Sequence, residues 1–226
     1  ELGLIVETEY RLYPDTVSVE MVTVIRPPGA REFRLPLGDW FAYGSRSRPW
    51  TPGAGFGVEK FAMPWIGAFG EGHSFGLVYE DSATPLGFVA AQGIPYAEMR
   101  VGQVEMSRDN PAVYRRWFVI GDGTLDSIRL EAAALRGEEL PGRAVAGLVL
   151  DDAGKEVSGA EVVFRRENGA EQEWVTAVES GSEGSFEAWL EPGIYEAEIS
   201  NFSGPLKKTV EVEVLEQGDM ELRVPQ

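Results

Sequence analysis

Apolar and polar residues alternate strictly between closely spaced turns, and this period of two constrains the fold of the chain more than any other feature. In TVEVEVLEQGDMELRV, residues 209–224, valines alternate with glutamates up to Val214, and the alternation resumes at Met220 after a Gln-Gly-Asp turn. A period of two places one side of a strand against a core and the other in solvent. The 27 glycines and 14 prolines separate such segments at short intervals. The sequence therefore predicts an all-β protein.

The predicted strands fall into two groups. In the first half, DTVSVEMVTVIRP predicts a strand that ends at Pro27-Pro28, because two prolines remove two hydrogen-bond donors. The other strands predicted in that half span 4–12, 31–37, 74–80, 86–91, 97–106 and 113–120. The second half predicts seven shorter strands at 143–150, 160–166, 173–179, 185–190, 194–200, 207–215 and 219–224. Seven short strands in about 85 residues are typical of a small antiparallel sandwich.

One segment between the two groups has a helical period. In GTLDSIRLEAAALRGEELPG, the residues Leu125, Ile128 and Leu135 are spaced as on one face of a helix. Cap and stop signals flank it, with Thr124 or Asp126 at the start and Gly137 and Pro141 at the end. We place the domain boundary here, which predicts two consecutive β-sandwich domains at 1–138 and 142–226. The alternative is that the segment forms one more strand of the first domain.

The charge also changes near this boundary and excludes several partners. The chain has a formal net charge of −17, and residues 1–140 hold 13 basic and 19 acidic side chains against 7 and 18 in residues 141–226. Such a field repels nucleic acids and anionic lipids. No stretch approaches the roughly 20 apolar residues that span a bilayer, so we expect no membrane insertion. Cysteine is absent, which excludes disulfides and thiolate metal sites.

The second half carries a recognisable motif order. It reads AGLVLDDAGKEVSGAEVVF and then SGSEGSFEAWLEPGIYEAEI, with glycines at turn positions, a Pro192-Gly193 reversal and Tyr195 placed to bury its ring. This half resembles the carboxypeptidase regulatory-like domain, a seven-stranded transthyretin-like (prealbumin-like) sandwich. The resemblance implies a noncatalytic accessory role and an exported location, in the periplasm, at the cell surface or secreted. The first residues, ELGLIVETEY, lack the features of a signal peptide.

The first half carries looser motifs. EYRLYPDTVSVEMVTVI, LGDWFAYG, WIGAFGEGHSFGLVYE and YRRWFVIGDGTLDSI resemble the β-rich region of exported bacterial proteins in which two such modules precede a metal-dependent hydrolase domain of the polymerase and histidinol phosphatase (PHP) class. The pattern is also similar to mutarotase-like supersandwiches, which accompany carbohydrate-active domains. A PHP-class domain binds metal through several histidine and carboxylate ligands, and this chain has one histidine. The resemblance thus implies that the catalytic domain lies outside this chain, and we expect no cofactor or metal within it.

Aromatic residues are concentrated between residues 33 and 79, which hold eleven of the 24 aromatic side chains. Gly-rich loops in this region can display rings to a sugar or a peptide. The candidate ligand-binding residues are Trp40, Tyr43, Trp50, Trp65, Arg46 and Arg48. The alternative is that large rings fill the core of a wide sandwich. Trp65, in FAMPWIGAF, is predicted to be core, whereas Trp50, between two prolines, is predicted to be an exposed loop ring.

The single histidine raises the question of catalysis. His73 lies near Glu71 in GEGHSFG, and either that carboxylate, Asp39 or Glu59 is a candidate partner for general acid–base chemistry. A lone histidine without a partner motif is also explained by a structural role. We therefore assign no catalytic or metal-binding residue, and keep His73 and Glu71 only as candidates for catalysis.

Two functions remain open. The first is a noncatalytic accessory or scaffold region of an exported multidomain bacterial protein, a PHP-class metallohydrolase being one case, whose partners are its own catalytic domain, a protein or a glycan. The second is a carbohydrate-binding or mutarotase-like activity in the first half. An enzyme activity of this chain alone is not expected.

The two-domain organisation predicts where a protease cuts first. Limited proteolysis should cleave between Arg136 and Arg143, because a connector between two folded units is more accessible than their strands. The products are identified by mass spectrometry. First cleavage elsewhere, with this segment protected, would contradict the boundary.

Overall fold

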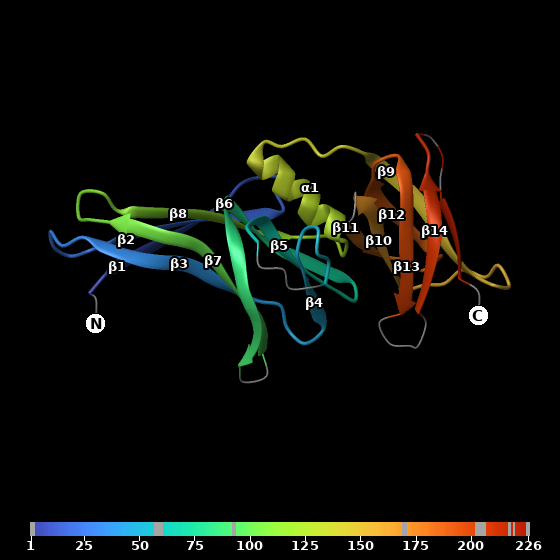
Figure 1. Cartoon of the computed structure of the whole chain (residues 1–226), viewed down its shortest axis with the longest axis horizontal. Coiled ribbons are helices and arrows are strands. Elements are labelled where there is room, and N and C mark those ends of the chain that lie inside the picture. Colours follow the sequence, from blue (N-terminus) through green and yellow to red (C-terminus); the bar gives the residue numbers. More distant parts are fainter. Residues whose placement is uncertain are drawn as a thin grey trace.

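The computed structural model describes residues 3–56, 61–91, 94–168, 171–201, 207–216, 218 and 220–224. It confirms an all-β fold with a helix between two groups of strands (Figure 1). The first group comprises β1 (Ile5–Leu12), β2 (Ser18–Arg26), β3 (Phe33–Ala42), β4 (Ser47–Trp50), β5 (Met63–Gly70), β6 (His73–Ala91), β7 (Ile94–Met106) and β8 (Ala112–Ile120). The second comprises β9 (Arg143–Asp151), β10 (Ala160–Asn168), β11 (Glu171–Glu179), β12 (Ser185–Leu190), β13 (Gly193–Asn201), β14 (Lys207–Val214) and β15 (Met220–Val224).

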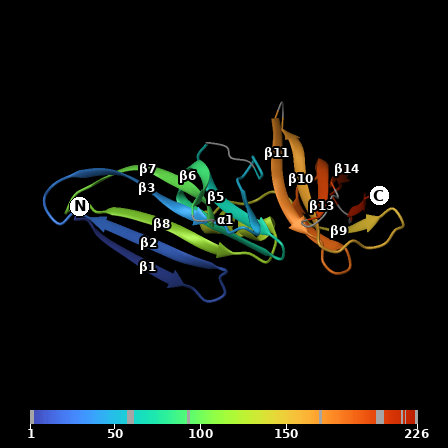
Figure 2. The ribbon, with the colours of Figure 1, turned by 90° about the horizontal axis from the view of Figure 1, so that it is seen from below.

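The long strand β6 builds a two-layered sandwich in the first half. Its first part lies between β8 and β5 in the order β1-β2-β8-β6-β5-β4, and its second part pairs with β7, which pairs with β3 (Figure 2). The β3–β7 layer packs over the larger one. The buried residues between the layers are Phe41, Met63, Ile66, Ala68, Leu77, Tyr79, Ala83, Ala97, Met99 and Tyr114. One strand thus belongs to both layers.

The second half forms two further sheets, ordered β11-β10-β13-β14 and β12-β9-β15. All seven strands predicted there are present. The expectation of a fully antiparallel sandwich is wrong for one pair, since β15 runs parallel to β9. These two strands open and close this half, and the long connection between them permits a parallel pairing that a hairpin forbids. The transthyretin-like assignment stays a prediction.

The structure of the first half differs from the sequence prediction in two places. Segments 74–80 and 86–91 belong to the single strand β6, and strands β4 and β5 were not predicted. Strand β5, MPWIGAFG, is buried on both faces and so lacks polar alternation. Strand β4 contains Pro49, which argues against a strand in a sequence but is tolerated at a sheet edge.

Helix α1 (Leu125–Arg136) confirms the helical prediction, and the alternative of another strand is wrong. The Thr124 side chain accepts a hydrogen bond from the Ser127 amide at the N-terminus, and Gly137 ends the helix in a left-handed conformation with φ of 69°. Asp126 therefore does not cap the helix. Its buried carboxylate reaches the second half instead.

Asp126 and Arg129 together bind the main chain of Trp189 on the edge strand β12. The Asp126 carboxylate accepts from the Trp189 amide at 2.6 Å, and Arg129 donates to the Trp189 carbonyl. An ion pair of 2.9 Å joins the two side chains. Burial raises the pKa of Asp126, and the Arg129 charge opposes that rise. The helix thus supplies the hydrogen-bond partners that a further strand would give to this edge.

An apolar cluster also joins the two halves. Trp50 and the helix residue Ile128 belong to the same cluster as Val163 on β10 and Ala177 on β11. Trp50 packs edge-on against Trp174 with ring centroids 6.1 Å apart. In the described residues, the pairings between named strands stay within one half or the other. The division at residues 138–142 remains a prediction, but the two halves share core residues.

Replacement of Asp126 by Ala should destabilise the protein by about 3–5 kcal/mol, because it leaves the Arg129 charge and the Trp189 amide without their shared partner. Urea unfolding measures the change. Glu138→Ala, which removes an exposed partner of Arg136, is the control and should cost less than about 1 kcal/mol. Similar losses in both variants would contradict the role given to Asp126.

Candidate functional site

The outer face of strands β3 and β7 displays an exposed tryptophan. Alternation along β3 turns Phe41 into the core and Trp40 outward, where 75% of Trp40 is exposed. Its ring stacks on Tyr96 of β7, with centroids 5.3 Å apart and planes inclined by 30°. The two residues are diagonal neighbours across the strand pair. The stack holds the Trp40 ring in place and leaves most of its surface open.

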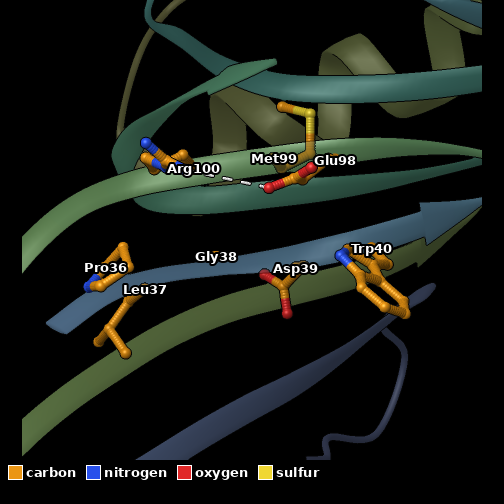
Figure 3. A pocket seen from close by; sticks show the side chains of 8 residues that line it. All are labelled: Pro36, Leu37, Gly38, Asp39, Trp40, Glu98, Met99 and Arg100. Carbon is orange, nitrogen blue, oxygen red and sulfur yellow. Dashed lines mark ion pairs between the residues drawn. The ribbon is translucent and has the colours of Figure 1, made fainter. Parts of the chain in front are cut away.

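A hollow of about 440 Å³ lies beside this ring (Figure 3). It is lined by Pro36, Leu37, Gly38, Asp39, Trp40, Glu98, Met99 and Arg100. The pairing of β3 with β7 shifts register between Leu37 and Gly38. A Cβ atom at Gly38 would lie 1.9 Å from the Met99 carbonyl oxygen, so the bulge requires glycine there. The absence of a side chain at Gly38 lets the β7 main chain approach β3 closely at the hollow.

Charged side chains flank the hollow on β7. Glu98 and Arg100 approach to 4.0 Å, and both are about half exposed, which is the geometry of a weak surface pair. A carboxylate and a guanidinium at this spacing offer both acceptors and donors to a bound polar molecule.

The Asp39 carboxylate makes its hydrogen bonds with side chains of β8. It accepts from Arg116 at 2.9 Å and from the Tyr114 hydroxyl. Burial and the Asp39 charge raise the pKa of Tyr114, so the phenol stays protonated and donates. Asp39 therefore holds β3 against β8, and it is not the partner of His73 that the sequence allowed.

A second hollow of about 440 Å³ lies where the two halves meet. It is lined by Ser45, Arg46, Ser47, Arg48, Glu71, Glu161, Ser200 and Asn201. Arg48 stacks over Phe56 and forms an ion pair with the buried Glu161 of β10. Burial raises the pKa of Glu161, and the Arg48 charge opposes that rise. The predicted candidates Arg46, Arg48 and Glu71 come together here.

His73 borders this region and makes two hydrogen bonds. Its Nε2 lies 2.6 Å from the Ser47 hydroxyl, and its Nδ1 lies 2.8 Å from the backbone carbonyl oxygen of Glu71. The described contact between His73 and Glu71 therefore involves the backbone carbonyl of Glu71 and not its carboxylate. Glu59 lies outside the described residues. No group of three or more potential metal ligands occurs in the part of the chain that the structure describes.

The tryptophan candidates separate into two kinds. Trp40 is exposed, whereas Trp65 is 6% exposed and lies in the core, as predicted for it. The prediction that Trp50 is an exposed loop ring is wrong, because it is fully buried against Phe56 and Trp174. Tyr43 is partly buried against the core of the first half. Trp40 is thus the one of the three candidate tryptophans that faces solvent.

Sequence reasoning missed Tyr96, Glu98 and Arg100. The alternation in IPYAEMR places these three on one face of a strand. The sequence does not reveal that this strand pairs with β3, and so could not place these residues beside Trp40.

Comparisons with known proteins reveal no family. No protein-family model and no curated protein matches the chain. The GH36 α-galactosidases AgaA and AgaB from Geobacillus stearothermophilus each show 14% identity and a TM-score of 0.43, over 68% and 67% of this chain and 27% of theirs. A polysaccharide lyase shows 9% identity and a TM-score of 0.42, over 96% of this chain and 35% of its own. The chain spans about a third or less of these structures, and such similarity carries no argument about activity.

Among the described residues, no helix has the length and apolar character that a membrane span requires. That the chain does not insert into a membrane stays an expectation from the sequence. An exported location stays a proposal.

The two kinds of tryptophan predict different stabilities. Trp50→Ala should cost about 3–5 kcal/mol, because it empties a buried site that both halves line. Trp40→Ala should change the free energy of unfolding by less than about 1 kcal/mol, as other surface substitutions do. Denaturant titration of both variants measures the difference. An equally large loss in Trp40→Ala would show that its ring supports the fold.

Proposed function

We propose that this chain is an accessory β-sandwich module that binds carbohydrate through the outer face of β3 and β7. The observation that carries the proposal is the exposed Trp40 ring, stacked on Tyr96 beside the first hollow. An exposed large aromatic ring held rigidly by a second ring is typical of a binding surface. The sequence left two functions open. This face supports the carbohydrate-binding function for the first half of the chain.

The chemistry of the face suits a sugar. One side of a pyranose ring presents C–H groups that pack on an aromatic face, while its hydroxyls require donors and acceptors nearby. Glu98 and Arg100 flank the same hollow and supply both. Since the chain has a formal net charge of −17, we propose a neutral rather than an anionic glycan.

The accessory role rests on the sequence resemblance of the second half to regulatory-like domains. In this proposal the chain is exported and belongs to a larger protein whose catalytic domain lies elsewhere, with a PHP-class hydrolase as the implied neighbour. The face on β3 and β7 would then hold that neighbour close to a glycan.

A panel of neutral oligosaccharides, tested by isothermal titration calorimetry, examines this function. Trp40→Ala should weaken binding about tenfold or more, since stacking on a ring contributes on the order of 1 kcal/mol beyond the contact area that is lost with it. Tyr10→Ala removes another exposed ring, on β1, and is the matched control. The proposal would be overturned if no glycan binds, or if Trp40→Ala leaves binding as unchanged as Tyr10→Ala does.

A further inference from the structure

Three residues on neighbouring strands form a row beside the second hollow. Ser47 of β4 lies opposite Gly70 of β5, and Gly70 lies opposite His73 of β6. Residues directly opposite one another point their side chains to the same face of a sheet. Neighbouring strands are about 4.8 Å apart, so the outer two backbones are separated by roughly 10 Å. Side chains at such positions meet only if the middle residue leaves room.

Gly70 leaves that room. A Cβ atom built at Gly70 would lie 2.8 Å from Cε1 and 3.0 Å from Nε2 of His73. The imidazole therefore occupies the space over the glycine, and its Nε2 reaches the Ser47 hydroxyl at 2.6 Å. Phe75 stacks against the ring with planes inclined by 11°. The position of the ring is thus set by packing as well as by hydrogen bonds.

The hydrogen bonds of His73 determine the direction of proton transfer. A backbone carbonyl oxygen can only accept, so the contact with Glu71 requires that Nδ1 carries the proton. Nε2 of the neutral ring then holds a lone pair, and the Ser47 hydroxyl donates to it. A hydroxyl that donates to an imidazole, which a third group orients, is the arrangement of an activated serine.

Ser47 also has access to a cavity. It is 9% exposed and lines the hollow between the two halves together with Arg46 and Glu71. The described part of the chain shows no carboxylate paired with Arg46. A guanidinium in the hollow can stabilise a negative oxygen that forms on a substrate.

We propose that Ser47 and His73 are the nucleophile and the general base of a site that hydrolyses small acyl esters. The site shares no residue with the glycan-binding face and stands independently of it.

The reaction needs no cofactor. The Ser47 oxygen attacks the acyl carbon, and its proton moves to His73 Nε2. The resulting oxyanion collapses, the bond to the alcohol oxygen breaks, and the alcohol leaves with the proton from Nε2. Water then attacks the acyl-serine with His73 again accepting a proton, and the carboxylic acid is released as Ser47 recovers its hydrogen. The sum is ester plus water to acid plus alcohol.

The test uses the full chain, a fluorophosphonate probe and p-nitrophenyl acetate. We expect one covalent phosphonyl adduct, located on Ser47 by peptide mass spectrometry, and an ester hydrolysis rate that falls 10²- to 10⁴-fold in His73→Gln. Ser185→Ala changes an exposed serine on β12, outside the hollow, and should keep both adduct and rate. Melting temperatures of all variants exclude unfolding as the cause.

Chemical rescue separates a base from a structural contact. His73→Gly leaves a space over Gly70, and added imidazole should restore ester hydrolysis there but not in Ser47→Ala. A Ser47 adduct that persists unchanged in His73→Gln, labelling spread over several serines, or no adduct at all would overturn the proposal. None of these outcomes depends on whether the chain binds glycans.

Discussion

The apolar cluster between the two halves is the contact on which the rest of the structure depends. Trp50 ends strand β4, packs against Trp174 and lies in the same cluster as Ile128 of the helix. Burial of a tryptophan side chain contributes several kcal/mol, far more than the surface ion pairs around it. The cluster fixes β4 at the edge of its sheet, and β4 carries Ser47 and Arg48. The second hollow therefore exists because the two halves share this cluster.

Much of the fold was readable from local patterns. Period-two alternation located all seven strands of the second half, and the caps at Thr124 and Gly137 located the helix. Strand β5 was missed because burial on both faces removes the polar half of the pattern. The parallel pairing of β15 with β9 was missed because alternation reports faces and not strand direction. The turn at 217–219 lies partly outside the described residues.

The candidate sites were predicted less well, for a physical reason. Exposure of a tryptophan depends on what packs against it, and the partner of Trp50 is more than a hundred residues away in the sequence. The flanking prolines could not reveal it. Likewise, Ser47 and His73 meet only through the pairing of both their strands with β5, and the essential residue between them is a glycine. A search of the sequence for catalytic side chains does not consider glycine, which has no side chain.

The shared core also has a consequence for the evolution of the chain. β-sandwich modules are commonly exchanged between proteins as independent units, which requires each module to bury its own apolar residues. Here an exchanged second half would have to bring its own equivalents of Val163, Ala177 and the Trp189 main chain to meet Trp50 and the Asp126–Arg129 pair. Replacement by an unrelated sandwich would expose a tryptophan and a buried ion pair at once. The two halves are therefore expected to be inherited together, as a single unit of recombination.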